Sequence, residues 1–298
     1  MVFDINTYLN YFKPTDFDIN TYLDSLPEDT KCINLEGRNL TFIPSLERFK
    51  NLQALYCSDN ELTSLPSLNE NLRELNCQYN ELTSLPCLNE NLRVLICDNN
   101  ELTSLPCLNE NLRELNCSDN DLTSLPCLNE NLEELYCDNN QLTSLPCLNE
   151  NLEKLYCNTN QLTSLPSLNK NLQLLYCWDN QLTSLPSLNE KLQSLYCWDN
   201  ELTSLPCLNE NLHEIHFNNN PICEIIDIEI EKDICNKQIQ TLNNFRHLYW
   251  CLKFKKQLNK WLWEKIKEPK IMKQYHPNNL FKNLQEDTDL NKFLDNLV

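Results

Sequence analysis

The sequence predicts an α/β repeat solenoid with a parallel β-sheet on its concave face, an irregular or 3₁₀ convex side, and helical caps at both ends. Three observations support this fold class. A frame centred on Cys57 returns every twenty residues as far as Cys197, and once more with Phe217 in that position. Its constant letters are leucine, asparagine and proline, and helical patterns replace the frame at both ends. Fixed-period repetition indicates stacked units that bury one continuous core.

Residues 1–30 are expected to form an N-terminal helical cap. The segment FDINTYLN at residues 3–10 returns as FDINTYLD at residues 17–24. Asp4 and Asp18 are suited to N-cap two short helices, and Pro27 is expected to end the second helix. A solenoid needs such a cover because its first coil has no preceding neighbour.

Residues 31–223 are expected to form the solenoid, with about ten rungs. Each full rung reads L-x-x-L-x-C-x-x-N-x-L-T-S-L-P-x-L-N-E-N, and a degenerate first rung carries Leu35 twenty-two residues before Cys57. The first half of the rung resembles the leucine-rich-repeat template, with cysteine replacing the third leucine. Twenty residues leave no room for a full helix on the return, where proline favours extended or 3₁₀ backbone. The short period and LTSLP are similar to bacterial effector leucine-rich repeats, which implies a horseshoe with an irregular convex side.

The constant positions are expected to point inward. Leu75 and Cys77 lie two apart on a strand and therefore on one side, so the cysteines from Cys57 to Cys197 should form a buried column of reduced thiols. No Cys-x-x-Cys pair is present, which disfavours zinc, and no metal site is expected. Asn80 and its equivalents should bond the backbone of adjacent rungs. A second cysteine column alternates with serine, which favours packing near a surface over chemistry: Cys87, Cys107, Cys127, Cys147 and Cys207.

The variable positions are expected to point outward on the concave face and to form two zones. The N-terminal zone is acidic, with Glu74, Asp98, Glu114, Asp119, Glu134 and Asp138. The C-terminal zone is aromatic, and its six rings are the candidate partner-binding residues: Tyr136, Tyr156, Tyr176, Trp178, Tyr196 and Trp198. If a third of their area is exposed, these rings present roughly 300–500 Å², the size of a meaningful surface patch. Two alternatives stay open: stacking that only stabilises the sheet, and stacking with a single-stranded nucleic acid, which the acids oppose.

Residues 224–298 are expected to form a C-terminal helical cap or small helical domain. One helical face would carry Leu248, Leu252, Leu258, Leu262 and Ile266, with Pro269 closing that helix, and a second would carry Leu290, Phe293, Leu294 and Leu297. Residues 237–273 hold ten lysines and arginines against two glutamates. Such a basic helix suits a membrane surface or a calmodulin-type partner, or is the solvated face of a packed helix. Membrane contact is expected nowhere else.

The composition argues against several classes of function. The net charge of −19 and isoelectric point of about 4.6 disfavour nucleic acid as a partner. A single glycine, Gly37, argues against phosphate-binding and dinucleotide loops, so no cofactor and no small-molecule substrate are expected. No basic leader followed by an apolar run precedes the repeats, and no apolar stretch of about 18 residues occurs, so an intracellular, cytoplasmic protein is expected.

A further resemblance covers nearly the whole chain. The opening FDINTYLDSLPEDTKCINLEGRNL and the closing WLWEKIKEPKIMKQYHPNNLF resemble leucine-rich-repeat proteins of mimivirus-type giant DNA viruses. The resemblance implies a viral product in the host cytoplasm, with packaging in the virion as an alternative, and brings no catalytic residues. The expected function is therefore a non-catalytic scaffold that binds a protein or peptide, basic in character, on the concave face.

Two rival functions stay open. A structural component of the viral particle is one. The other is an effector with a ubiquitin-ligase-type activity in its C-terminal part, for which Cys235 and Cys251 would be the candidate nucleophiles, with His247 and His276 as bases. The ligase domain of such effectors is much larger than residues 224–298, and no enzyme activity is expected.

Overall fold

The computed structural model describes residues 17–226 and 232–253, which fall into two compact units that divide between Ile228 and Glu229. The predicted cap at Asp4 and the predicted helical faces beyond Lys253 lie outside the described residues. The domain boundaries proposed from the sequence stay predictions.

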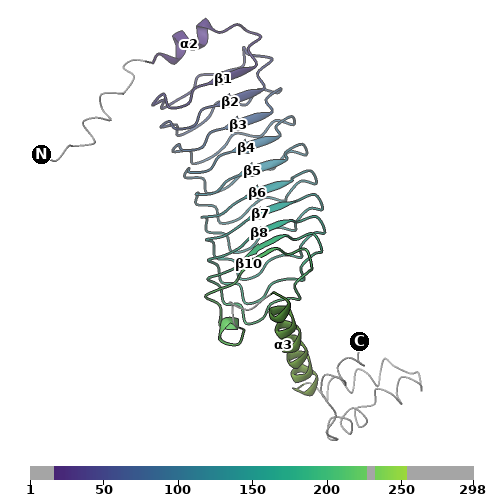
Figure 1. Cartoon of the computed structure of the whole chain (residues 1–298). Helices are drawn as coiled ribbons and strands as arrows, with labels where there is room; N and C mark the ends of the chain where they lie inside the picture. The colour runs from purple at the N-terminus through teal and green to yellow at the C-terminus, as the bar shows by residue number, and fades with distance from the viewer. Residues whose placement is uncertain (1–16, 227–231, 254–298) are drawn as a thin grey trace, which may run out of the picture. The chain divides into compact units, whose positions relative to one another are not determined.

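The first unit is a solenoid built around one parallel sheet of ten strands in sequence order, β1 to β10 (Figure 1). Every strand is three residues long and pairs in register with the strand twenty residues later, or twenty-two for β1 and β2. This confirms the predicted solenoid with a parallel β-sheet. The strands are Cys32–Asn34, Ala54–Tyr56, Glu74–Asn76, Val94–Ile96, Glu114–Asn116, Glu134–Tyr136, Lys154–Tyr156, Leu174–Tyr176, Ser194–Tyr196 and Glu214–His216.

The core consists of the leucine and cysteine positions that repeat without change. In the β5 rung, Leu112, Leu115, Cys117 and Leu122 are fully buried, and the equivalent residues from β3 to β9 are buried as well, whereas Ile215 of β10 is only half-buried. The inward position predicted for the first cysteine column is therefore confirmed. Burial raises the pKa of the Cys57 thiol to about 12 and also raises the pKa of the other thiols in this column. These thiols are therefore protonated near neutral pH.

Asparagine side chains connect the rungs. The Asn80 amide nitrogen donates to the carbonyl oxygens of Cys57, Cys77 and Gln78 at 3.0–3.1 Å, while its Oδ1 accepts from the Leu62 N–H at 3.0 Å. The same bonds recur along the column, as the sequence predicted. They satisfy backbone groups that the three-residue strands leave unpaired.

The constant letters N-E-N form two more asparagine ladders, which sequence reasoning did not identify. Asn109 Nδ2 donates to the Asn89 carbonyl oxygen at 2.6 Å, and Asn111 Nδ2 donates to the Glu90 carbonyl oxygen at 2.8 Å. Both bonds repeat every twenty residues through most of the solenoid. Each rung is thus fixed to the previous one at the strand, at the turn after it and at the opposite corner.

The turn after each strand from β2 onwards uses left-handed backbone without glycine, whereas the turn after β1 contains Gly37 at φ of 64°. The residue two positions after each core cysteine has φ between 49° and 54°, from Asp59 to Asn219. Asparagine and aspartate tolerate this region best, and they fill most of these positions. Tyr79 and Thr159 do not fit this preference, and Thr159 is β-branched. The return segments are irregular, and the 3₁₀ helix found in the described residues, η2, comprises Pro221–Glu224.

Helices occur at both ends of the described chain. In α2, Ile19–Ser25, Asp18 caps the N-terminus by accepting from the Asn20 N–H at 3.0 Å, and the helix ends before Pro27, as predicted. Ile19 and Leu23 are buried. Arg48 bonds the Leu23 carbonyl oxygen and pairs with Asp24.

The second unit contributes α3, Lys232–Lys253, which confirms helical structure in this part of the predicted C-terminal segment. Neither α3 nor any other helix in the described part of the chain is long and apolar enough to cross a membrane.

Candidate binding surface

The outward face of the sheet carries two columns of variable side chains. The first column occupies the last position of each strand, from Tyr56 in β2 to His216 in β10. The second column follows the core cysteine, from Ser58 to Asn218. Strand pairing in register stacks equivalent residues of adjacent rungs, so Tyr136, Tyr156, Tyr176 and Tyr196 are direct neighbours. Because the frame repeats, residues of the same type at one position of successive rungs form a continuous column on the surface.

The six predicted site residues form one stacked cluster. Ring centroids along the tyrosine column are 4.7, 4.4 and 4.3 Å apart with interplanar angles of 16–22°, and Trp178 stacks on Trp198 at 4.9 Å. Tyr196 meets Trp198 edge to face at 5.6 Å, which joins the two columns. His216 stacks on Tyr196 at 4.7 Å and extends the cluster to seven rings. His216 was not among the site residues predicted from the sequence.

Stacking determines which parts of these rings can meet a partner. Tyr156, Tyr176 and Tyr196 each have a ring against both faces, so their exposed parts are ring edges and hydroxyl groups. All six predicted residues are half-buried. Ring edges carry the positive end of the aromatic quadrupole, and the phenol and indole groups offer hydrogen-bond donors. We call these seven residues the aromatic cluster.

The acidic zone is extensively hydrogen-bonded within itself. Glu134 accepts from the Tyr136 hydroxyl at 2.7 Å and from Lys154 Nζ at 2.8 Å. Burial alone would raise the pKa of Glu134, but these two bonds lower it overall. Lys154 thus neutralises the carboxylate that lies beside the first ring of the aromatic cluster.

Two further carboxylates of this zone are held by neighbouring rungs. Asp98 accepts from Asn99 at 2.9 Å and from Asn116 at 3.0 Å, and Asp138 accepts from the Ser118 hydroxyl at 2.6 Å. Burial is the main reason that the pKa values of Asp98 and Asp138 lie above their ordinary value. The second column is therefore less exposed than its outward assignment suggests, and Ser58, Ser118 and Asn158 in it are buried as well.

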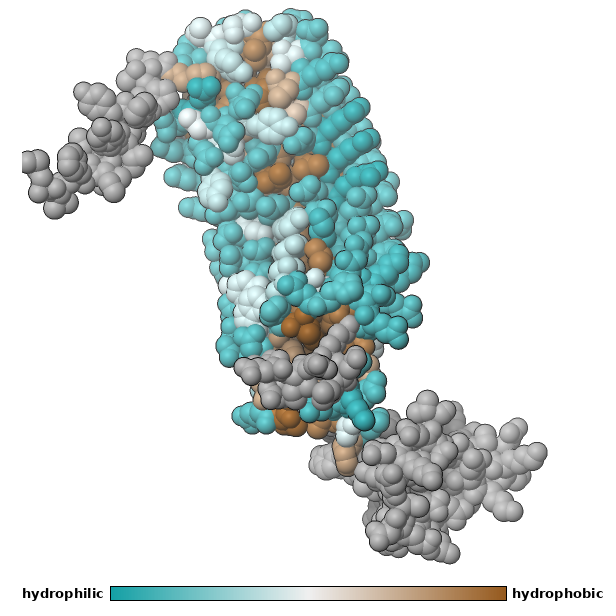
Figure 2. Space-filling view, viewed as in Figure 1, coloured by the Kyte–Doolittle hydropathy of each residue, from teal (hydrophilic) through white to brown (hydrophobic). Residues whose placement is uncertain are grey.

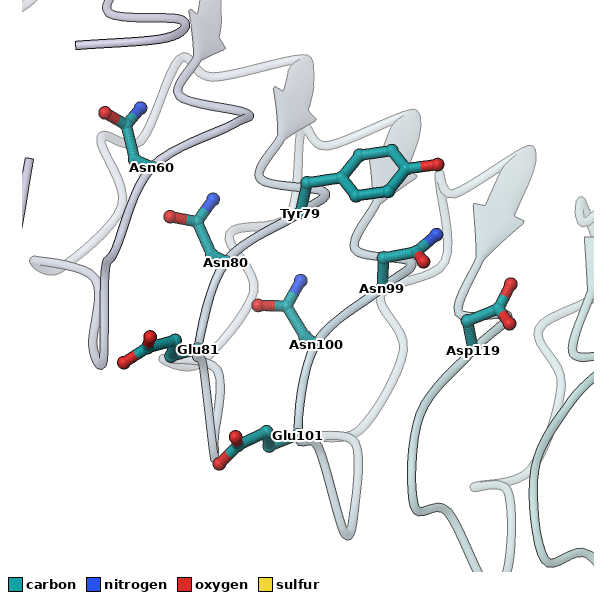
Figure 3. A pocket seen from close by; sticks show the side chains of 8 residues that line it. All are labelled: Asn60, Tyr79, Asn80, Glu81, Asn99, Asn100, Glu101 and Asp119. Carbon is teal, nitrogen blue, oxygen red and sulfur yellow. The ribbon is translucent and has the colours of Figure 1, made fainter. Parts of the chain in front are cut away.

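An open pocket of about 410 Å³ lies at the turns that follow the N-terminal strands (Figure 3). Asn60, Asn80 and Asn100 line up along it, and they belong to the asparagine ladder that binds the backbone. Because these amides are already engaged, the pocket is a consequence of the turn geometry. Its remaining lining residues are Tyr79, Glu81, Asn99, Glu101 and Asp119, so none of the aromatic cluster takes part.

Metal-binding side chains do not gather in the described part of the chain. Within residues 17–226 and 232–253, no three histidine, cysteine, aspartate or glutamate side chains are placed to hold a metal ion. Figure 2 shows a largely hydrophilic surface with scattered hydrophobic patches on the face that it presents. The described surface thus offers aromatic edges and polar groups for binding.

Comparisons with known proteins agree with this architecture. The family described as Leucine Rich repeats (2 copies) matches residues 110–150 and 130–170. No curated protein matches the chain. The leucine-rich effector YopM from Yersinia pestis is 28% identical with a TM-score of 0.60, over 72% of this chain and 69% of that chain.

Two other solved structures are similar to part of the chain. The leucine-rich-repeat domain of a Shigella effector is 26% identical over 68% of this chain and 88% of that chain, with a TM-score of 0.49. The leucine-rich-repeat domain of LRIM1 is 18% identical over 71% of this chain and 72% of that chain, with a TM-score of 0.51, which shows the fold alone. Residues 110–170 thus match the leucine-rich-repeat family, and the solenoid has a leucine-rich-repeat fold similar to that of the effector YopM.

Proposed function

We propose that the chain is a non-catalytic scaffold that binds a protein or peptide on the outward face of its sheet, with the aromatic cluster as the anchor. The observation that carries this proposal is the continuity of the cluster, in which seven rings on five rungs lie in contact. Half-buried tyrosine and tryptophan side chains are common anchors of protein interfaces, because they supply area at a low entropic cost.

The stacking geometry favours a protein over a single-stranded nucleic acid. Bases bind such surfaces by stacking on exposed ring faces, whereas the inner tyrosines here have both faces covered by neighbouring rings. The net charge of the solenoid also favours a protein partner over a nucleic acid. Residues 1–223 hold 32 of the 43 acidic residues and 11 of the 24 basic residues, a net charge of −21. This charge repels phosphate backbones and steers basic proteins toward the solenoid.

Other chains with this fold are known in protein complexes. The solved structures include a complex of Toll with Spatzle from Drosophila and a complex of LRIM1 with APL1C. Their identities to this chain are 24% and 18%, and the chain spans 29% and 46% of the matched chains. They support the general use of leucine-rich repeats as interaction scaffolds.

The test is a double variant in the centre of the cluster. Tyr176→Ala with Trp178→Ala should abolish partner capture, because each buried aromatic anchor is commonly worth about 2 kcal/mol or more of binding. Capture is measured by proximity labelling in cells and then by pull-down with the partner so identified. The melting temperature should fall by only a few degrees, because neither ring belongs to the core.

A control variant must change the same two columns without breaking hydrogen bonds between rungs. Asn116 and Ser118 bond Asp98 and Asp138, so truncating them would disturb the fold. Gln78→Ala with Ile96→Ala changes the same two columns in the other half of the face, and it should affect neither capture nor melting. If the aromatic pair instead unfolds the protein while capture per folded molecule is unchanged, the rings only stabilise the sheet.

We also propose, from the resemblance of the chain ends, that the protein is a giant-virus product acting in the host cytoplasm. Detection in the soluble cytoplasm of infected amoebae supports this proposal. Abundance in purified particles would instead support a structural component of the virion. A ligase-type activity has less support, because Cys235 is buried within α3. Labelling of Cys235 or Cys251 by a thiol-reactive ubiquitin probe would revive it.

A further inference from the structure

A row of reactive groups lies on the return side of the solenoid, away from the sheet. Four consecutive rungs carry an exposed free thiol directly after the conserved proline, at Cys87, Cys107, Cys127 and Cys147. The same position holds serine in other rungs, at Ser67, Ser167 and Ser187. The sequence suggested packing near a surface for these cysteines, but the structure exposes them.

The spacing of these thiols follows from the stacking of rungs. Two residues beyond the cysteine, the Asn109 amide reaches the Asn89 carbonyl oxygen at 2.6 Å and the Asn149 amide reaches the Asn129 carbonyl oxygen at 2.5 Å. These bonds hold adjacent returns in register, and a spacing close to the about 4.8 Å of paired strands is expected for them. Cα atoms of disulfide-bonded cysteines lie about 4.4–6.8 Å apart, so equivalent cysteines on neighbouring rungs are within bridging distance.

The inner cysteine column provides the contrast. Its thiols are also one rung apart, but they are fully buried, and burial keeps them protonated by raising the pKa of thiols such as Cys77 and Cys97. Thiolates are the reacting species in disulfide exchange, and a small disulfide cannot enter a dry core. Exposure therefore distinguishes the outer row, which an oxidant can reach.

We propose that neighbouring thiols of the row Cys87, Cys107, Cys127 and Cys147 form a reversible oxidation site that reacts with low-molecular-weight disulfides such as oxidised glutathione. One cysteine loses its proton, and its thiolate attacks a sulfur atom of the small disulfide and releases one thiolate. The thiolate of the adjacent rung then attacks the protein sulfur of this mixed disulfide and releases the second. Two electrons pass from the protein to the small disulfide, and two protons end on the released thiols.

The geometry makes this bond easy to reduce again. Side chains stacked in register start with Cβ atoms about one rung spacing apart, whereas disulfides need about 3.8 Å, so the returns must approach each other by roughly 1 Å. The strands do not extend into the returns, so the sheet need not break. A bond that forms under strain and on the surface has a higher reduction potential and reverses readily.

Cys207 offers a built-in control. It is exposed at the same rung position, but Ser187 occupies the rung before it and the repeat ends after it. The experiment treats the native full chain at low micromolar concentration with oxidised glutathione, blocks free thiols and maps the products by mass spectrometry. Cleavage after Arg93 and Arg113 separates Cys87 from Cys107 and both from Cys127. We expect links between adjacent rungs within monomers, and a glutathione adduct on Cys207.

A single variant sharpens the result. Cys107→Ser introduces the residue that other rungs already carry, so it should fold, and it leaves Cys87 without an adjacent thiol. Cys87 should then retain glutathione as Cys207 does, while Cys127 and Cys147 still link. Glutathione adducts on every thiol of the row in the wild-type chain would overturn the proposal. Links between chains, or a link from Cys87 to Cys77 in the variant, would also overturn it.

Discussion

Two adjoining columns at the turn after each strand are constrained in different ways, one in its side chain and the other in its backbone. The column of Asn120 keeps asparagine in every full rung, and each member makes its hydrogen bonds through the side chain. The column of Asp119, one residue earlier, keeps its left-handed backbone in every rung, while its side chain varies among asparagine, aspartate, tyrosine and threonine. One column is constrained by its amide and the other by its φ angle.

This difference explains which positions of the repeat vary from rung to rung. A left-handed backbone costs most residues about 1–2 kcal/mol, and the remaining contacts of the rung can absorb that cost. A missing amide in the next column would leave several backbone groups of two rungs without partners, and nothing nearby could replace it. Variation therefore collects in columns where the scaffold needs only a backbone shape, and those columns border the outward face.

The largest expected effect is at the constant column. Asn120→Ala removes bonds from Nδ2 to the carbonyl oxygens of Cys97, Cys117 and Ser118 and from the Leu102 N–H to Oδ1. We expect a loss of about 1–3 kcal/mol in the free energy of unfolding, the usual cost of unpaired buried groups. Urea denaturation measures it.

Two companions sharpen this prediction. Asn120→Asp keeps the acceptor but turns a second oxygen toward three carbonyl oxygens, so it should cost at least as much as alanine. Thr123→Ala, at an exposed position of the same rung, should stay within about 0.5 kcal/mol of wild type. Equal costs for Asn120→Ala and Thr123→Ala would show that the ladder does not stabilise the stack.

Much of the fold could be predicted because the positions that stay constant between repeats are the positions that the fold requires. The period, the inward Leu115 and Cys117, the Asn120 ladder and the Asp18 cap all follow from spacing and from the need to satisfy buried polar groups. The ladders of Asn109 and Asn111 were missed because both residues look like ordinary corner asparagines. Their partners are backbone carbonyls twenty or twenty-one residues earlier in the chain, which no local pattern reveals.

The surface was harder to predict than the core. The six aromatic residues were identified because register brings equal letters together, but the sequence could not show that stacking would cover the faces of Tyr156 and Tyr176. It also could not show that Lys154 would neutralise Glu134, or that Asn158 would be buried between rungs. These outcomes depend on side-chain rotamers, which the period does not determine.

The variable column provides a second test, of intermediate size. Thr159 adopts φ of 50° although it is β-branched, whereas the equivalent residue of most rungs is asparagine or aspartate. Thr159→Asn should stabilise the protein by about 0.5–1 kcal/mol, because asparagine tolerates this region. The reverse change, Asp179→Thr at φ of 53°, should destabilise by a similar amount. Thermal unfolding of both variants decides the point, and a loss of stability in Thr159→Asn would show that the threonine side chain matters more than its backbone.

The smallest effect is expected one column further toward the strand, where charge and burial compete. Burial raises the folded-state pKa of Asp138 above its unfolded value, so between these two values the folded protein binds more protons, and its stability rises as the pH falls. Above both values the buried charge costs stability.

Asp138→Asn removes that charge and keeps an oxygen that can accept from Ser118. At pH 7 the variant should therefore be more stable, by no more than about 1 kcal/mol, and the advantage should shrink as the pH approaches 4. Unfolding curves of the variant and the wild type at a series of pH values measure the difference. A variant that is less stable than wild type at pH 7 would mean that the carboxylate's bond to Ser118 outweighs the cost of burying its charge, which would make this column a constrained part of the scaffold like that of Asn120.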